Sequence, residues 1–235
     1  MCDIILLANT KKRRLNKLNE QYIYPVAQRM SLIKSENYSK VSDIWNKYFQ
    51  DENKTGAPQL LIKTAAEAQK GNLTAADWEA FFLKSGERRL KELADGQKNE
   101  YQINKSTGRT MKDITNLAKE LFEKVREIGG VNLGKVAAMN VVYCKLIDEP
   151  YIMYMMQCKA IEKLKQEHPS RTYKVADAVL CEEYGIDIIE YDGDDINKAY
   201  QVITKKTTEE KKAIFIQQHT MFHANFGTEV EFLFV

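Results

Sequence analysis

The side chains that could do chemistry begin with two histidines, His219 and His223, which lie four positions apart. On a helix this spacing places both imidazoles on one face, where they could share a metal ion. A zinc site needs a third protein ligand, and Thr220 stands where the glutamate of an H-E-x-x-H motif would be. The pattern therefore favours two ordinary helix side chains over a metal centre.

The densest group of carboxylates in the chain is Glu190, Asp192, Asp194 and Asp195. Carboxylates at a junction between a strand and a loop can hold Mg²⁺ or Ca²⁺. The spacing is not that of an EF-hand, and no E-x-K sequence of a nuclease core follows. We therefore expect a solvated turn that caps the next helix, which is predicted over 196–203.

The sequence from Gly129 to Lys135 matches the G-x-x-x-x-G-K core of a phosphate-binding loop. Such a loop needs a hydroxyl side chain after the lysine to bind magnesium, and Val136 occupies that position. The preceding element is an amphipathic helix, whereas a phosphate-binding loop follows a buried strand. The pattern favours a glycine-rich connection between two helices.

Two carboxylates, Glu229 and Glu231, form an E-x-E sequence in the last strand that the sequence predicts. ADP-ribosyltransferases carry such a pair, together with an arginine and a Ser-Thr-Ser-like strand upstream. The nearest equivalent here is Ser106 to Arg109, which has the composition of a loop. Alternation of polar and apolar side chains along a strand accounts for the pair without catalysis.

A basic cluster lies near the N-terminus and consists of Lys11, Lys12, Arg13, Arg14 and Lys17. These side chains could neutralise phosphates of a nucleic acid. The whole chain has 35 lysines and arginines against 33 acidic residues, so its net charge of +2 implies no general attraction to nucleic acid. Nucleic-acid binding is accordingly our second hypothesis.

A soft, aromatic stretch is a candidate for contacts with another protein. It is formed by Tyr151, Ile152, Met153, Tyr154, Met155 and Met156. Large neighbouring side chains on one helix cannot all face one direction, so some must contact another element or another chain. The chain also has apolar segments at 4–8 and 232–235 that would suit the same role.

Composition bounds the class of protein. The apolar fraction of 44% and charged fraction of 29% are those of an ordinary globular protein. The four cysteines form no C-x-x-C pair, and no apolar run approaches the length of a membrane span. We expect a protein that is neither secreted nor in a membrane, located in the cytoplasm or in a particle assembled inside the cell.

Periodicity predicts the elements that position these residues. Few prolines and glycines favour a mainly α-helical, bundle-like body with a few short strands. Strands are predicted at 186–191 and 228–235, in a small sheet that includes the C-terminal strand and also the chain start, and Pro150 is expected to end a helix. The helices and caps predicted most clearly are a Thr74–Asp77 capping box and helices over 59–70, 111–128, 175–184 and 211–225.

The predicted organisation has an N-terminal helical region over 1–95, a polar linker or mobile loop over 96–110, and a helical core with the C-terminal strand over 111–235. A single domain over 1–235 is the alternative. The linker is predicted because 96–110 is polar, carries glycines near both ends and shows no sustained periodicity.

Every catalytic or metal motif above lacks a required residue or its proper flanking element. Our first hypothesis is therefore a non-catalytic structural protein that makes subunit contacts, with itself or with other assembly proteins, and needs no cofactor. Usage rich in Lys, Asn and Ile is typical of an AT-rich genome, so a phage virion connector, ring or packaged protein is the concrete instance. A metal-dependent enzyme using His219 and His223, or the carboxylates of 190–195, is the third hypothesis.

Overall fold

The computed structural model describes residues 23–96, 99–204 and 207–235 of the chain. The contacts between residues divide it into two compact units. The helical unit is made of the described residues of Met1–Pro58 and Leu73–Pro150, and the α/β unit of those of Gln59–Asn72 and Tyr151–Val235. This grouping differs from the division expected around 96–110, because it places 59–72 with the C-terminal part of the chain.

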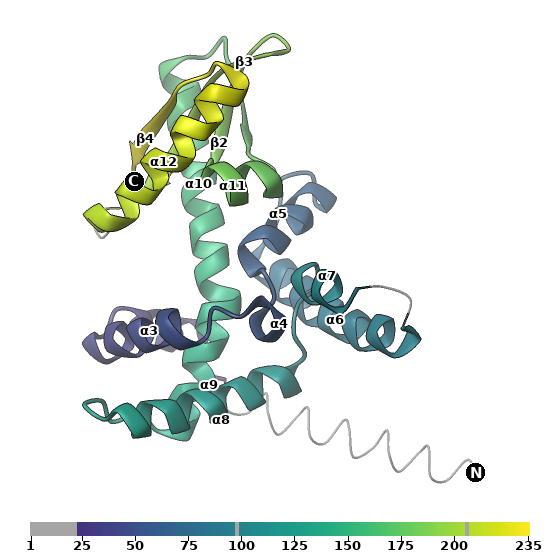
Figure 1. Ribbon diagram of the computed structural model, residues 1–235, viewed down its shortest axis with the longest axis vertical. Helices are drawn as coiled ribbons and strands as arrows, with labels where there is room; N and C mark the ends of the chain where they lie inside the picture. Colours follow the sequence, from purple (N-terminus) through teal and green to yellow (C-terminus); the bar gives the residue numbers. More distant parts are fainter. Residues whose placement is uncertain (1–22, 97–98, 205–206) are drawn as a thin grey trace. The chain divides into compact units, whose positions relative to one another are not determined.

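The helical unit packs its helices around large apolar side chains. Its elements are α2 (Val26–Ile33), α3 (Glu36–Tyr48), α4 (Glu52–Thr55), α6 (Ala75–Asp95), α7 (Glu100–Lys105), α8 (Met111–Ile128), α9 (Lys135–Tyr143) and the π-helix η1 (Cys144–Asp148) (Figure 1). Trp78 and Phe82 of α6 are fully buried, and the Trp78 indole donates a hydrogen bond to the Ile147 carbonyl at 2.9 Å. The capping box predicted at Thr74 and Asp77 is confirmed.

The chain does not leave the helical conformation at Pro150. Helix α10 (Glu149–Glu167) follows directly on η1, and Pro150 is its second residue. A π-helical turn widens the helix, and Glu149 donates its N–H to the carbonyl of Cys144, five residues back. The expected break at Pro150 was therefore wrong, because a turn of this kind accommodates a ring that would clash in a regular α-helix.

The α/β unit is a small mixed sheet with helices on both of its faces. Its elements are α5 (Pro58–Ala68), α10, β1 (Thr172–Val175), α11 (Ala178–Tyr184), β2 (Ile188–Asp192), β3 (Asp195–Ile203), α12 (Glu209–Phe226) and β4 (Val230–Phe234). The order across the sheet is β1-β2-β3-β4, with β1, β2 and β3 antiparallel and β4 parallel to β3.

Two apolar cores fix the layers of this unit. On one face, Leu164 of α10 packs against Ile188 and Val202 of the sheet. On the other face, Phe222 of α12 packs against Ile189, with α11 contributing partly buried side chains. Figure 1 shows α12 running alongside the sheet next to β4. A mainly α-helical chain whose small sheet includes the C-terminal strand is thus confirmed.

Two strands differ from the sequence prediction. The segment 196–203 was predicted to be a helix capped by Asp194 or Asp195, but it is strand β3. Gly193, at a φ of 65°, turns the chain tightly so that Asp192 and Asp195 pair across a β-hairpin. Residues 172–175 form strand β1, and the helix expected from 175 begins only at Ala178.

Candidate functional site: the α12–β4 face

Helix α12 carries more apolar side chains than one face of a helix can bury. Thr208 caps it by accepting a hydrogen bond from the Lys211 N–H, and Gly227, at a φ of 67°, ends it. Phe222 is fully buried against the sheet. Other large side chains of this helix remain open to solvent, namely Ile214 (57% exposed), Ile216 (55%), Met221 (56%) and Phe226 (48%).

Strand β4 lies at the edge of the sheet. It pairs only with β3 among the described strands, so its other edge is open. Phe232 and Leu233 are half-buried, whereas Phe234 is 60% exposed and Val235 is 46% exposed. An open edge that carries large apolar side chains is a surface suited to pairing with another strand. We call β4 together with the adjoining side of α12 the α12–β4 face.

A shallow groove of about 370 Å³ runs between α12 and β4. Its lining includes Ile216, His219 and His223 from the helix and Phe232 from the strand. The His219 ring lies 5.2 Å from the Phe232 ring, centroid to centroid, and burial lowers the pKa of His219. No described group hydrogen-bonds the buried Nε2 atom of His219. The groove therefore has a mixed lining, with Ile216, Val230 and Phe232 beside polar side chains, and the imidazole of His219 in its wall is neutral at pH 7.

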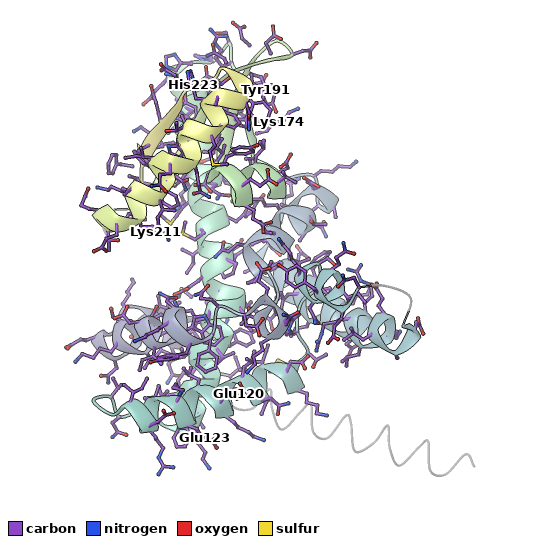
Figure 2. The ribbon with its side chains drawn as sticks, viewed as in Figure 1. Glu120, Glu123, Lys174, Tyr191, Lys211 and His223 are labelled. Atoms are coloured by element: carbon purple, nitrogen blue, oxygen red, sulfur yellow. The ribbon has the colours of Figure 1, made fainter. Side chains whose placement is uncertain are left out.

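The two histidines are not brought to a metal site in the described part of the chain. His219 is buried. His223, which is labelled in Figure 2, lies one turn further along α12 and is exposed. Glu229 also lines the groove, yet no group of three or more His, Cys, Asp or Glu side chains in the described residues could hold a metal ion.

The acidic cluster at 190–195 is divided among different roles. Burial raises the pKa of Glu190, but hydrogen bonds from the Tyr200 hydroxyl at 2.6 Å and the Asn197 amide at 2.5 Å outweigh it and lower that pKa. Asp192 pairs with Arg171. Asp194 and Asp195 are exposed at the β2–β3 turn. Glu190 also lies 3.8 Å from Arg171, so Glu190 and Asp192 share this cation, whereas Asp194 and Asp195 lie in the exposed turn.

The other motifs also separate into structural roles. Gly134 is the N-cap of α9 and α8 precedes the glycine-rich connection, so the geometry of a phosphate-binding loop is absent from this segment. In the E-x-E pair, Glu231 is bonded to Lys198 at 2.8 Å and Glu229 is exposed. Arg109 is only 1% exposed and donates to backbone carbonyls, so its guanidinium is occupied.

For two sets of residues, the predicted contacts with nucleic acid or with another protein stay predictions. The basic residues Lys11 to Arg14 and Lys17 lie outside the described residues. In the stretch 151–156, which forms part of α10, Tyr154 is buried and its hydroxyl donates to the Gly71 carbonyl at 3.4 Å. The other five side chains of this stretch are half-buried.

A buried polar cluster in the α/β unit was missed from the sequence. The Asp187 carboxylate, 5% exposed, accepts hydrogen bonds from the Gln157 and Gln201 amides and from the Val202 N–H, at 2.6, 2.8 and 2.8 Å. Burial raises the pKa of Asp187. Lys63, also 5% exposed, donates to the Ala176 carbonyl at 2.8 Å. The only signal in the sequence was a lysine within the apolar run of 60–66.

Comparisons of the chain with protein-family models, with curated proteins and with solved structures give no match. The function is therefore inferred from the residues and their geometry.

Proposed function

We propose that this chain is a non-catalytic assembly protein whose α12–β4 face pairs with the same face of a second copy. The observation that carries this proposal is the open edge of β4, with exposed Phe234 on the strand and exposed Ile216 on the adjoining helix. Two buried carboxylates support it indirectly. Asp148 forms an ion pair with Arg29, and Asp187 accepts a hydrogen bond from the Gln157 amide, so both have partners inside the fold.

The backbone of β4 is oriented for such pairing. The Glu229 carbonyl accepts from Ala199, and the Val235 N–H donates to Ile203, so both residues direct their backbone groups toward β3. Backbone direction alternates along a strand, and Glu231 and Leu233 therefore do the same. Val230, Phe232 and Phe234 direct their N–H and C=O groups to the open edge, where a second strand would bond them.

The charge pattern favours an identical strand as the partner. Natural edge strands are often protected by charged side chains that repel another strand. In β4 the only charged residue is Glu231, and Lys198 neutralises it within the same sheet. Two antiparallel copies of β4 related by a two-fold axis would contact each other without like-charge repulsion. The two sheets would become one continuous sheet.

The apolar side chains supply the driving force. Burying a large apolar side chain fully contributes about 1.5–3 kcal/mol. Phe234 and Ile216 are each more than half exposed, and a two-fold interface uses each of them twice. We further propose that such pairs build the larger assembly expected from the sequence, a virion connector, ring or packaged protein being the concrete instance.

Sedimentation velocity over a wide range of protein concentration tests the pairing. The wild-type chain is expected to form a dimer whose fraction rises with concentration. Phe234→Lys and Ile216→Lys should each weaken the dimerisation affinity about tenfold or more, because in either variant each of the two copies would bury an unpaired lysine ammonium in the interface. Leu90→Lys is the matched control, since Leu90 is 48% exposed on α6, which belongs to the helical unit and not to the α/β unit that carries this face.

Two outcomes would overturn the proposal. One is a wild-type chain that stays monomeric at the highest concentration. The other is a dimer that Phe234→Lys and Leu90→Lys affect equally.

A further inference from the structure

A cavity of about 590 Å³ lies in the helical unit between α8 and α9, and nothing argued so far uses it. We call it the α8–α9 groove. Its apolar wall includes Ala118 and Phe122 of α8 with Val136 and Met139 of α9. This volume is in the range of small-molecule sites, which are mostly apolar with a few polar groups that orient the ligand.

Two cations lie over one aromatic ring in this groove. The Arg126 guanidinium carbon lies 5.6 Å and the Lys135 ammonium 5.7 Å from the centroid of the Phe122 ring. Both side chains line the groove, and within the described residues neither forms an ion pair. Like charges held near one ring repel each other, and an anion placed between them would relieve that repulsion.

The backbone adds to the positive potential at this end. Helix α9 begins at Lys135, and its N-cap Gly134 has no side chain to accept hydrogen bonds from the first N–H groups. The first turn of a helix carries a partial positive charge from those groups. The glycine-rich segment 129–135, whose sequence resembles a phosphate-binding loop, therefore leads into the cationic end of the α8–α9 groove.

The two ends of the groove also differ in their side chains. Its lining on α8 extends from Thr115 to Arg126, which is about 16 Å along the helix axis. The paired cations stand at the Arg126 end, whereas Thr115, Ala118 and Met139 line the remainder. Lys119 flanks this remainder as a third cation, and Glu123 is the acidic side chain of the lining, labelled on α8 in Figure 2.

We propose that the α8–α9 groove binds an anionic amphiphile, a medium-chain carboxylate, with its headgroup between Arg126 and Lys135. The alkyl chain would lie along Phe122 and Met139 toward Thr115. Charge complementarity selects an anion, and the apolar wall selects a chain over a bare phosphate or nucleotide. This site is independent of the α12–β4 face, so either proposal can fail alone.

Calorimetric titration with decanoate, below its micelle concentration, measures the affinity of the groove for this ligand. Decanoate is expected to bind, octanoate to bind more weakly by about fourfold for each methylene lost, and decylammonium not to bind. The double variant R126Q/K135Q should weaken decanoate binding at least about tenfold. Lys112→Gln, a lysine of α8 that does not line the groove, is the matched control and should leave the affinity unchanged.

A second measurement locates the ligand. Decanoate should shift the methyl NMR signals of Met139 and Val136 and leave those of Val179, on α11, in place. The proposal is overturned if decylammonium binds as well as decanoate, if R126Q/K135Q binds like Lys112→Gln, or if the methyl shifts fall outside the groove. Binding of an acidic amphipathic peptide without any binding of decanoate would likewise contradict it.

Discussion

Arg109 offers a direct test of how the segment 99–110 is held. Arg109 is only 1% exposed. Its guanidinium donates hydrogen bonds to six backbone carbonyls at 2.6–3.2 Å. Those carbonyls belong to residues 52–54 and to Asn104, Thr107 and Gly108. Burial, and then repulsion from Arg89, lowers the pKa of Arg109 to about 10, so the side chain stays charged at pH 7.

The change Arg109→Met keeps most of the side-chain length and removes every donor. The carbonyls of Asn104, Thr107 and Gly108 are bonded in buried surroundings and would be left without a partner, whereas those of 52–54 are closer to water. An unsatisfied buried group costs about 1–3 kcal/mol, and removal of a buried charge returns part of that cost. We therefore expect a loss of about 3 kcal/mol in the free energy of unfolding.

Urea unfolding followed by circular dichroism measures this loss. With a slope of about 2 kcal/mol per molar urea, the midpoint should fall by about 1.5 M. Arg88→Met is the matched control, because Arg88 is exposed on α6 and should cost less than about 0.5 kcal/mol. If the two variants unfold at the same urea concentration, Arg109 does not hold this segment as described.

Three further predictions concern charge. Burial lowers the pKa of His219, so as the pH decreases the unfolded chain takes up the proton before the folded chain does. The free energy of unfolding should therefore hold its full value above about pH 6.5 and fall as the pH decreases toward the folded-state pKa. His219→Phe should reduce the difference between the unfolding free energies measured at pH 7.5 and at pH 5.5. Asp187→Asn should cost about 2 kcal/mol in urea unfolding, because its new amide group faces donors, while Asp194→Asn in the exposed turn should cost almost nothing. If the second hypothesis is right, fluorescence anisotropy will show DNA or RNA binding that weakens with salt and is lost when residues 11–14 are changed to glutamine; binding that survives this change would contradict it.

Local signals predicted much of the fold. Helix α8 was predicted at its observed bounds because its apolar residues recur at helical spacing and a glycine follows it. The last strand was predicted because it alternates polar and β-branched or aromatic residues. Both patterns are contained in neighbouring residues and need no knowledge of the tertiary structure.

The errors arose where tertiary contacts outweighed local signals. Asp195 resembles a helix N-cap, but pairing of β3 with both β2 and β4 fixes 195–203 as a strand. The linker or mobile loop predicted at 96–110 stays a prediction, and in the second half of this segment Gly108 lies close to the backbone of Phe82, while Gly86 lies close to that of Arg109. A Cβ atom on either glycine would overlap those backbone atoms.

The candidate site was predictable only in part. Apolar residues at the C-terminus were a visible signal, and the apolar excess of α12 can be counted from the sequence. That β4 lies at the edge of the sheet, parallel to β3, depends on a topology that the sequence does not state. The α8–α9 groove was hidden for a similar reason, since Phe122 and Lys135 come from different helices.

Amide hydrogen exchange along β4, measured by NMR at low and high protein concentration, tests the pairing of two copies most directly. Glu231, Leu233 and Val235 should be protected at both concentrations, because their N–H groups face β3. Phe232 and Phe234 should become protected only at high concentration, as the second copy bonds the open edge. Rapid exchange of Phe232 and Phe234 at every concentration would contradict the proposed assembly.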